Sequence, residues 1–134
     1  MPLPSVRQAG AIPIRGGRVC LITSRTGRRW VIPKGWIESG KTPAITALSE
    51  AWEEAGVEGQ LSSDPIGQYT YEKAGRSYLV TVFVLEVTQE HEDWPEADER
   101  TRDWVTLDEA LTRIEEPELR DILREVLRGA TAGK

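Results

Sequence analysis

The sequence is poor in the residues from which several common kinds of site are built. It has one cysteine, Cys20, and one histidine, His91. A single cysteine allows no disulfide within the chain, which fits a reducing compartment and predicts a cytoplasmic protein. Zinc sites draw on several His and Cys ligands and hydrolytic triads use a histidine base, so the composition argues against both. We expect Cys20, in the apolar segment RVCLI, to be a small buried side chain.

A long apolar run and an excess of basic residues are also missing. The longest apolar stretch, residues 78–87, is interrupted by Thr81 and Glu86 and is too short to cross a bilayer. The N-terminal segment MPLPSVRQAG lacks the apolar core of a signal peptide. The net charge is −5, whereas nucleic-acid-binding domains usually carry a basic excess. We therefore expect neither a membrane nor a nucleic acid among the partners.

What the chain does contain is the pattern of one α+β domain over residues 1–134. Composition and turn residues predict strands at 19–23, 30–32, 66–72, 77–87 and 103–105, with an irregular segment at 88–100. A helix is predicted from Thr42-Pro43 to a C-cap at Gly56. Two more helices are predicted after the capping box that begins at Thr106 and from Pro117 onward.

The first predicted helix carries three glutamates near its C-terminal end: Glu50, Glu53 and Glu54. On a helical wheel they share one arc of about 100°. The like charges of Glu50 and Glu54 repel one another at i,i+4, and negative charge at a helix C-terminus opposes the macrodipole. Either this is a solvated acidic face or the carboxylates bind a divalent cation, and the helix alone leaves both readings open. The core face predicted opposite the glutamates comprises Ala44, Ile45, Leu48, Ala51, Trp52 and Ala55.

The residues around these glutamates resemble the signature of the Nudix hydrolase family. The signature reads Gly, five residues, Glu, seven residues, Arg-Glu, an aliphatic residue, any residue, Glu-Glu, any residue, Gly and an aliphatic residue. The chain matches it with the correct spacing at Gly35, Glu50, Glu53, Glu54 and Gly56. The resemblance implies the Nudix fold, a mixed β-sheet sandwiched between helices with a catalytic loop-helix-loop. It also implies hydrolysis of a diphosphate linked to another group.

The resemblance also implies roles for individual residues. Glu50 and Glu54 are the firmest metal ligands, and Glu53 is a third ligand or acts through a metal-bound water. A backbone carbonyl of Lys34 or Gly35 completes the shell around Mg²⁺, for which Mn²⁺ can substitute. All three glutamates are candidate catalytic residues, and any one of them could be the general base.

Two signature positions differ from the family. Lys41 stands where the family has Glu, and Ser49 stands where it has an Arg that helps to hold a catalytic glutamate in position. Three readings follow from these departures. The carboxylates are oriented more loosely, or another residue orients them, or the chain is a weakened enzyme or a ligand-binding module.

The stretches SRTGRRWVIPKGW, EAWEEAGVEG and EDWPEADERTRDWV look most like one branch of the family. That branch cleaves diphosphoinositol polyphosphates and dinucleoside polyphosphates, and its basic residues grip a highly phosphorylated small-molecule substrate. The substrate-binding candidates here are Arg25, Lys34, Lys73, Arg76 and Arg102, with Arg28, Arg29 and Arg100 considered beside them.

The residues before the first long strand put an inositol phosphate in doubt as the substrate. Inositol-phosphate members tend to be richly basic just before the first long strand, where this chain has AGAIPIRGG with only Arg15. A nucleotide base would stack on aromatic side chains, for which Trp36, Tyr69 and Tyr71 are candidates. Trp30 and Trp104 are predicted to be core residues. Nucleoside triphosphates and nucleotide sugars stay as alternative substrates, and the protein is expected to be a monomer or a homodimer.

Overall fold

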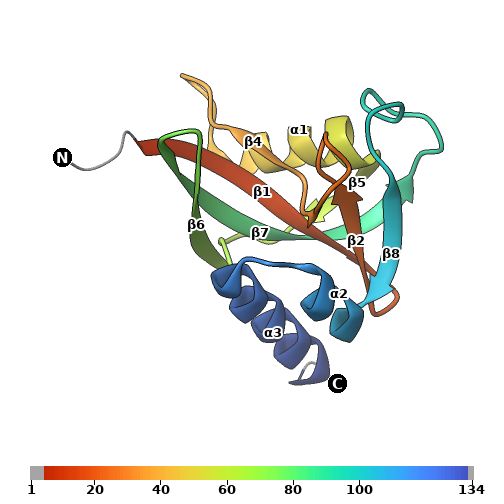
Figure 1. Ribbon diagram of the computed structural model, residues 1–134. Coiled ribbons are helices and arrows are strands. Elements are labelled where there is room, and N and C mark those ends of the chain that lie inside the picture. Colours follow the sequence, from red (N-terminus) through yellow and green to blue (C-terminus); the bar gives the residue numbers. More distant parts are fainter. Residues whose placement is uncertain (1–4, 133–134) are drawn as a thin grey trace.

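One mixed β-sheet runs through the middle of the molecule, and helices cover both of its faces (Figure 1). The structure is a computed structural model and describes residues 5–132. Its strands are β1 (Ser5–Arg15), β2 (Arg18–Thr23), β3 (Trp30–Val31), β4 (Lys34–Trp36), β5 (Val57–Leu61), β6 (Gly67–Lys73), β7 (Arg76–Glu90) and β8 (Arg102–Thr106). Its helices are α1 (Pro43–Ala55), α2 (Leu107–Arg113) and α3 (Pro117–Ala132). The predicted α+β class, with a sheet between helices, is confirmed.

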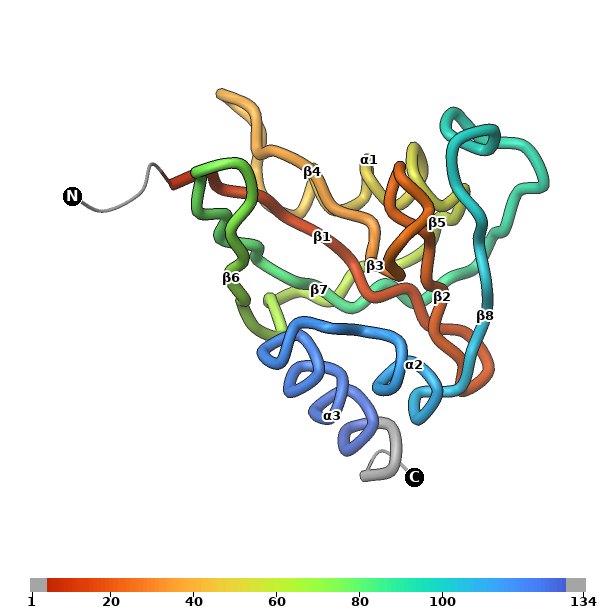
Figure 2. The backbone as a smooth tube through the Cα atoms, viewed as in Figure 1, coloured from red at the N-terminus to blue at the C-terminus, as the bar shows by residue number. Residues whose placement is uncertain are grey.

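Strand β1 lies at the centre of the sheet. It pairs in parallel with β7 from Ser5↔Ser77 to Ile14↔Glu86, and antiparallel with β2 near its C-terminal end. Its N-terminal half pairs antiparallel with β4, in the register Ala9↔Gly35. The tube view shows β4 running beside β1 before the chain turns into α1 (Figure 2). This order fixes the segment before α1 against the middle of the sheet.

Two apolar layers lie on the two sides of the sheet. The layer under α2 and α3 contains branched and aromatic side chains such as Leu21, Tyr69 and Leu123. The layer under α1 contains many alanines, among them Ala9 and Ala11 of the sheet and Ala47, Ala51 and Ala55 of the helix, together with Cys20. Cys20 is buried, as predicted, and Trp30 and Trp104 are only half-buried at the margins of the two layers.

The predicted helix boundaries are confirmed by their caps. The Thr42 side chain accepts a hydrogen bond from the Ile45 amide, and Gly56 ends α1 with φ 68°, a left-handed conformation that suits glycine. Thr106 caps α2 in the same way through the Glu109 amide. Among residues 5–132, no helix is long and apolar enough to cross a membrane.

Three strands, β1, β4 and β5, were not predicted from the sequence. Strand β1 contains Gly10 and Pro13, residues that are rare inside strands, yet it is buried from Gln8 to Pro13 between β7 and its antiparallel partners. Strand β4 was predicted as a loop because it is only Lys34–Trp36 and takes its strand conformation from β1. These strands depend on tertiary pairing more than on local propensity.

The predicted orientation of α1 was wrong. The helix buries Thr46, Ala47, Ala51, Glu54 and Ala55, whereas Ile45 and Leu48 are 50% and 40% exposed. Its buried side is therefore turned toward the glutamates instead of opposite them. The reason lies in the alanines, because a side with small residues can approach the sheet closely. We find no apolar partner for Ile45 or Leu48 in the core layers formed by residues 5–132.

Candidate active site

The glutamates of α1 face the short segment that leads into the helix. The backbone amide of Lys34 donates a hydrogen bond of 3.1 Å to Glu54 Oε1. The neighbouring Gly35 leaves room for Glu50, because a Cβ atom at position 35 would lie 2.4 Å from the Glu50 carboxyl carbon. Only a glycine permits this approach without a shift of the carboxyl group. The pairing of β4 with β1 therefore holds two consecutive backbone units against two carboxylates.

Glu50 and Glu54 form a close acidic pair. They lie one helical turn apart on α1, at positions i and i+4. Burial, with the Glu54 and Glu53 charges beside it, raises the pKa of Glu50 to about 8. Burial also raises the pKa of Glu54, although Arg100 and the Lys34 amide act in the opposite direction. The pair is thus a place where negative charge is held away from water and would be stabilised by an added cation.

Glu53 lies on the other side of Glu50. Its Oε2 accepts a hydrogen bond of 2.9 Å from the Ser49 hydroxyl. Glu53, Glu50 and Ser49 line a second cavity of about 400 Å³, together with Trp36 and Lys41. The structure therefore brings Glu50 and Glu54 together. Glu53 lies beside Glu50 on the helix surface and faces the second cavity.

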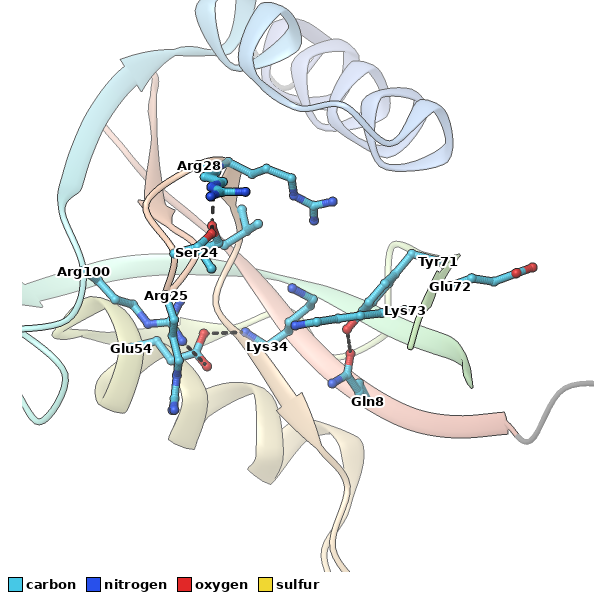
Figure 3. A pocket seen from close by; sticks show the side chains of 13 residues that line it. Gln8, Ser24, Arg25, Arg28, Lys34, Glu54, Tyr71, Glu72, Lys73 and Arg100 are labelled. Atoms are coloured by element: carbon cyan, nitrogen blue, oxygen red, sulfur yellow. Dashed lines mark hydrogen bonds and ion pairs between the residues drawn. The ribbon is translucent and has the colours of Figure 1, made fainter. Parts of the chain in front are cut away.

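The segment between β7 and β8 closes over the C-terminal end of α1. The Trp94 indole donates to the Glu54 carbonyl at 3.0 Å, and the Glu96 amide donates to the Glu53 carbonyl at 3.0 Å. Both bonds satisfy carbonyls that the end of a helix leaves without a partner. The same segment places Arg100 with its Nη2 atom 3.3 Å from Glu54 Oε2 (Figure 3).

A basic cavity of about 450 Å³ opens beside Glu54 (Figure 3). Its cationic lining residues are Arg25, Arg28, Arg29, Lys34, Lys73 and Arg100, and its acidic ones are Glu54 and Glu72. The cationic residues come from the β2–β3 turn, from β4, from the β6–β7 hairpin and from the segment before β8. Four separate parts of the chain thus place positive charge around one buried carboxylate, an arrangement suited to a polyanion.

The predicted substrate-binding residues divide into two groups. Arg25, Lys34 and Lys73 line the basic cavity. Arg76 lies instead over the ring of Trp36, with its guanidinium carbon 5.7 Å from the ring centroid. Arg102 donates to the carbonyls of Ala55 and His91, both at 2.8 Å, and pairs with Glu90, so it ties the end of α1 to the sheet.

The cavity also shows what sequence reasoning missed. Glu96 and Gln8 carried no local signal, since one lies in an acidic irregular segment and the other in an unpredicted strand. Gln8 accepts a hydrogen bond of 2.8 Å from the Tyr71 hydroxyl.

Within residues 5–132, Arg28 and Lys73 form no ion pair, whereas Arg25 and Arg29 are paired with Glu96 and Glu116.

The three aromatic candidates for base stacking differ in accessibility. Tyr69 is 2% exposed and belongs to the core. Tyr71 lines the basic cavity, stacks on Tyr78 at 4.7 Å between ring centroids, and has the Lys34 ammonium 5.3 Å from its own centroid. Trp36 is 52% exposed and lines the second cavity. Trp36 is therefore the most accessible flat surface of the three.

The acidic pair has the chemistry of a site for a hard divalent cation. Within residues 5–132, no three His, Cys, Asp or Glu side chains are grouped so that they alone could hold a metal ion. Mg²⁺ commonly takes only one or two carboxylates and completes its shell with water and substrate phosphates. Glu50 and Glu54, partly buried and mutually repulsive, fit that incomplete donor set.

Comparisons with known proteins show the family to which the chain belongs. The chain matches the NUDIX domain family over residues 4–128. It is 40% identical to Nudix hydrolase 4 of Arabidopsis thaliana over 95 residues, 69% of this chain and 45% of that protein. It is 35% identical to diphosphoinositol polyphosphate phosphohydrolase 3-alpha of Mus musculus over 100 residues, 72% of this chain and 60% of that protein. The chain therefore spans about half of the length of these curated relatives.

Solved structures support the fold. The chain superposes on an Ap4A hydrolase from C. elegans, determined as a binary complex, with a TM-score of 0.76 at 22% identity. That match covers 96% of this chain and 99% of the other. A NUDIX hydrolase from Nitrosomonas europaea gives a TM-score of 0.78 at 19% identity, covering 93% and 90%. The protein has the α+β Nudix fold, and it belongs to the NUDIX family.

Proposed function

We propose that this chain is a Mg²⁺-dependent hydrolase of phosphoric anhydrides that cleaves a diphosphate linkage in a small polyanionic substrate. The observation that carries the proposal is the acidic pair Glu50 and Glu54 at the margin of a cavity with six cationic side chains. Glu50 and Glu54 would hold Mg²⁺ or Mn²⁺, with Glu53 and the backbone of Lys34 or Gly35 as further candidates. The ion would neutralise phosphate charge and lower the pKa of bound water.

The residues of the chain would then bind and orient the substrate. Arg25, Arg28, Lys34 and Lys73 supply donors for phosphate oxygens on one side of the pair. We propose that one of the three glutamates, Glu50, Glu53 or Glu54, accepts the proton of the attacking water. We propose a single catalytic unit, a monomer or homodimer, acting in the cytoplasm.

For the substrate we propose a dinucleoside polyphosphate or a diphosphoinositol polyphosphate. The many Lys and Arg side chains around the basic cavity suit either substrate. The name of the mouse relative supports a diphosphoinositol polyphosphate. The exposed Trp36 beside Glu50 favours a substrate with a nucleotide base. Nucleoside triphosphates and nucleotide sugars form the second candidate class for the same reason.

The test is phosphate release by the purified protein with Mg²⁺ and with Mn²⁺. The panel contains diadenosine polyphosphates, diphosphoinositol polyphosphates, nucleoside triphosphates and nucleotide sugars. We expect turnover of one polyanionic class and its loss in Glu54→Gln, which keeps the shape of the side chain but removes its charge. Tight metal-dependent binding without turnover of any compound would refute hydrolysis and leave a binding module.

A further inference from the structure

The glutamates of α1 have no basic side chain from their own helix beside them. Position 49 holds a serine whose short side chain reaches only Glu53, at 2.9 Å. No Lys or Arg occurs anywhere in α1, residues 43–55. Glu54 is nevertheless 8% exposed, and a buried carboxylate needs partners that fix it. Some other part of the chain must supply them.

Arg100 supplies them from the segment before β8. Its Nη2 atom lies 3.3 Å from Glu54 Oε2, while the Lys34 amide donates to Glu54 Oε1 at 3.1 Å. Each oxygen of this carboxylate therefore has its own partner, the Lys34 amide from β4 for one and the Arg100 guanidinium from the segment before β8 for the other. Figure 3 shows Glu54 between these two groups.

The position of Arg100 is itself fixed. Its Nε lies 2.8 Å from Glu96 Oε1, and its Nη1 donates to the Thr23 carbonyl at 3.0 Å. Thr23 and Thr101 also exchange hydrogen bonds, which anchor the segment to the end of β2. The Arg100 side chain is 7% exposed, whereas that of Arg25 on the same cavity is 66% exposed. Arg100 thus points its donors at the protein, whereas Arg25 is exposed to solvent and pairs only with the surface carboxylates of Glu96 and Glu99.

We propose that Arg100 is the positioning residue for Glu54 and performs from a distant loop the orienting role that Ser49 cannot perform. Glu96 and the Thr23 carbonyl hold the guanidinium, and the guanidinium holds the carboxylate toward Glu50. Arg100 acts through Glu54 and does not need to touch the substrate. The inference rests on the proposed function, because it assumes that Glu54 binds the metal ion.

The test uses Arg100→Ala and the conservative Arg100→Lys, with Arg113→Ala as a matched control. Arg113 also pairs with two carboxylates, those of Asp103 and Glu109, but on the margin of β8 and α2. Partners that orient metal ligands typically contribute about 10- to 100-fold in metal affinity or activity. We expect a fall in kcat of this size in Arg100→Ala with KM unchanged, a smaller fall in Arg100→Lys, and no change in Arg113→Ala.

Calorimetric titration with Mg²⁺ gives a readout that does not depend on turnover. Removing a positive charge near Glu54 would by itself strengthen cation binding, whereas removing a positioning contact weakens it. We expect weaker Mg²⁺ binding in Arg100→Ala and partial recovery in Arg100→Lys. Equal or tighter binding, or a change confined to KM, would overturn the positioning role. Arg100→Lys keeps the test decisive if Arg100→Ala does not fold.

The same titration separates this inference from the proposed function. If the wild-type protein neither binds Mg²⁺ nor cleaves any compound of the panel, the proposed function and this inference fail together. If the wild-type protein binds Mg²⁺ and turns over substrate, and Glu54→Gln does neither, an unchanged Arg100→Ala refutes the positioning role alone.

Discussion

The two apolar layers of this protein are built differently and serve different ends. Under α2 and α3, large side chains such as Leu21, Tyr69 and Leu123 pack together in one buried cluster. Under α1, alanines of the helix and of β1 meet, so that helix and sheet approach closely. The first kind of layer buries more apolar surface per residue. The second places the glutamates of α1 against Lys34 and Gly35. One layer therefore mainly stabilises the fold, and the other mainly positions the site.

The largest effect on stability is expected in the layer under α2 and α3. Leu123 is fully buried in α3, and Leu123→Ala removes its branched side chain. Such substitutions destabilise proteins by about 2–5 kcal/mol because they leave a cavity. We expect a fall of this size in the free energy of unfolding, measured with urea. The kcat of the folded fraction should be unchanged, and a parallel fall in kcat would remove the distinction between the layers.

Gly35→Ala should produce the opposite pattern. The added Cβ would meet the Glu50 carboxyl, so the acidic pair must shift. A displacement of about 1 Å at a reacting centre can lower a rate by about 100-fold. We expect a loss of kcat of that order with a smaller effect on stability.

Gly129→Ala is the matched control for Gly35→Ala. A Cβ at position 129, on α3, would have no atom within 4 Å, and alanine favours helix. We expect full activity and equal or slightly higher stability. If Gly35→Ala behaves like Gly129→Ala, the close approach of Gly35 to Glu50 has no functional importance.

The acidic pair should also make the metal-free protein sensitive to pH. The pKa of Glu50 is raised from 4.5 to about 8, so the folded state binds more protons than the unfolded state between these values. Its contribution to stability is therefore fully present below about pH 4.5 and is lost as pH rises toward 8. Denaturation at pH 5 and pH 8, compared with Glu50→Gln, measures this contribution. We expect the loss at pH 8 to disappear in Glu50→Gln and to be reversed by Mg²⁺ in the wild-type protein.

Ser49→Arg is expected to have the smallest effect. Because Arg100 already holds Glu54, a guanidinium restored at position 49 has little left to orient. We expect kcat within about a factor of five of the wild-type value, since exposed ion pairs contribute about 0–1 kcal/mol. A large gain in kcat would show that the carboxylates of the wild-type protein are poorly held.

The sequence predicted those parts of the fold that local chemistry determines. Thr42-Pro43 and Gly56 marked the ends of α1 correctly, and the hairpin between β6 and β7 followed from its turn residues. Strand β1, with Gly10 and Pro13, takes its conformation from β7 and β4 and could not be predicted locally. The rotation of α1 had the same cause, because the alanines of β1 decide which side of the helix can approach.

The site was predictable to a similar extent. The spacing of Glu50, Glu53 and Glu54 singled out the helix, and Arg25, Lys34 and Lys73 do line one cavity. The partners of Glu54 could not be read from the sequence, because Arg100 lies 46 positions further along the chain and reaches Glu54 only through the folded segment before β8. Arg102, two residues away, binds backbone carbonyls instead.

The central claim is that Glu50 and Glu54 together bind a divalent cation at the margin of the basic cavity. Anomalous scattering from crystals of the protein soaked in Mn²⁺ tests this claim most directly. The account predicts one strong peak between the two carboxylates in the wild-type protein, absent in Glu54→Gln. A peak elsewhere, or one that persists unchanged in Glu54→Gln, would contradict the account.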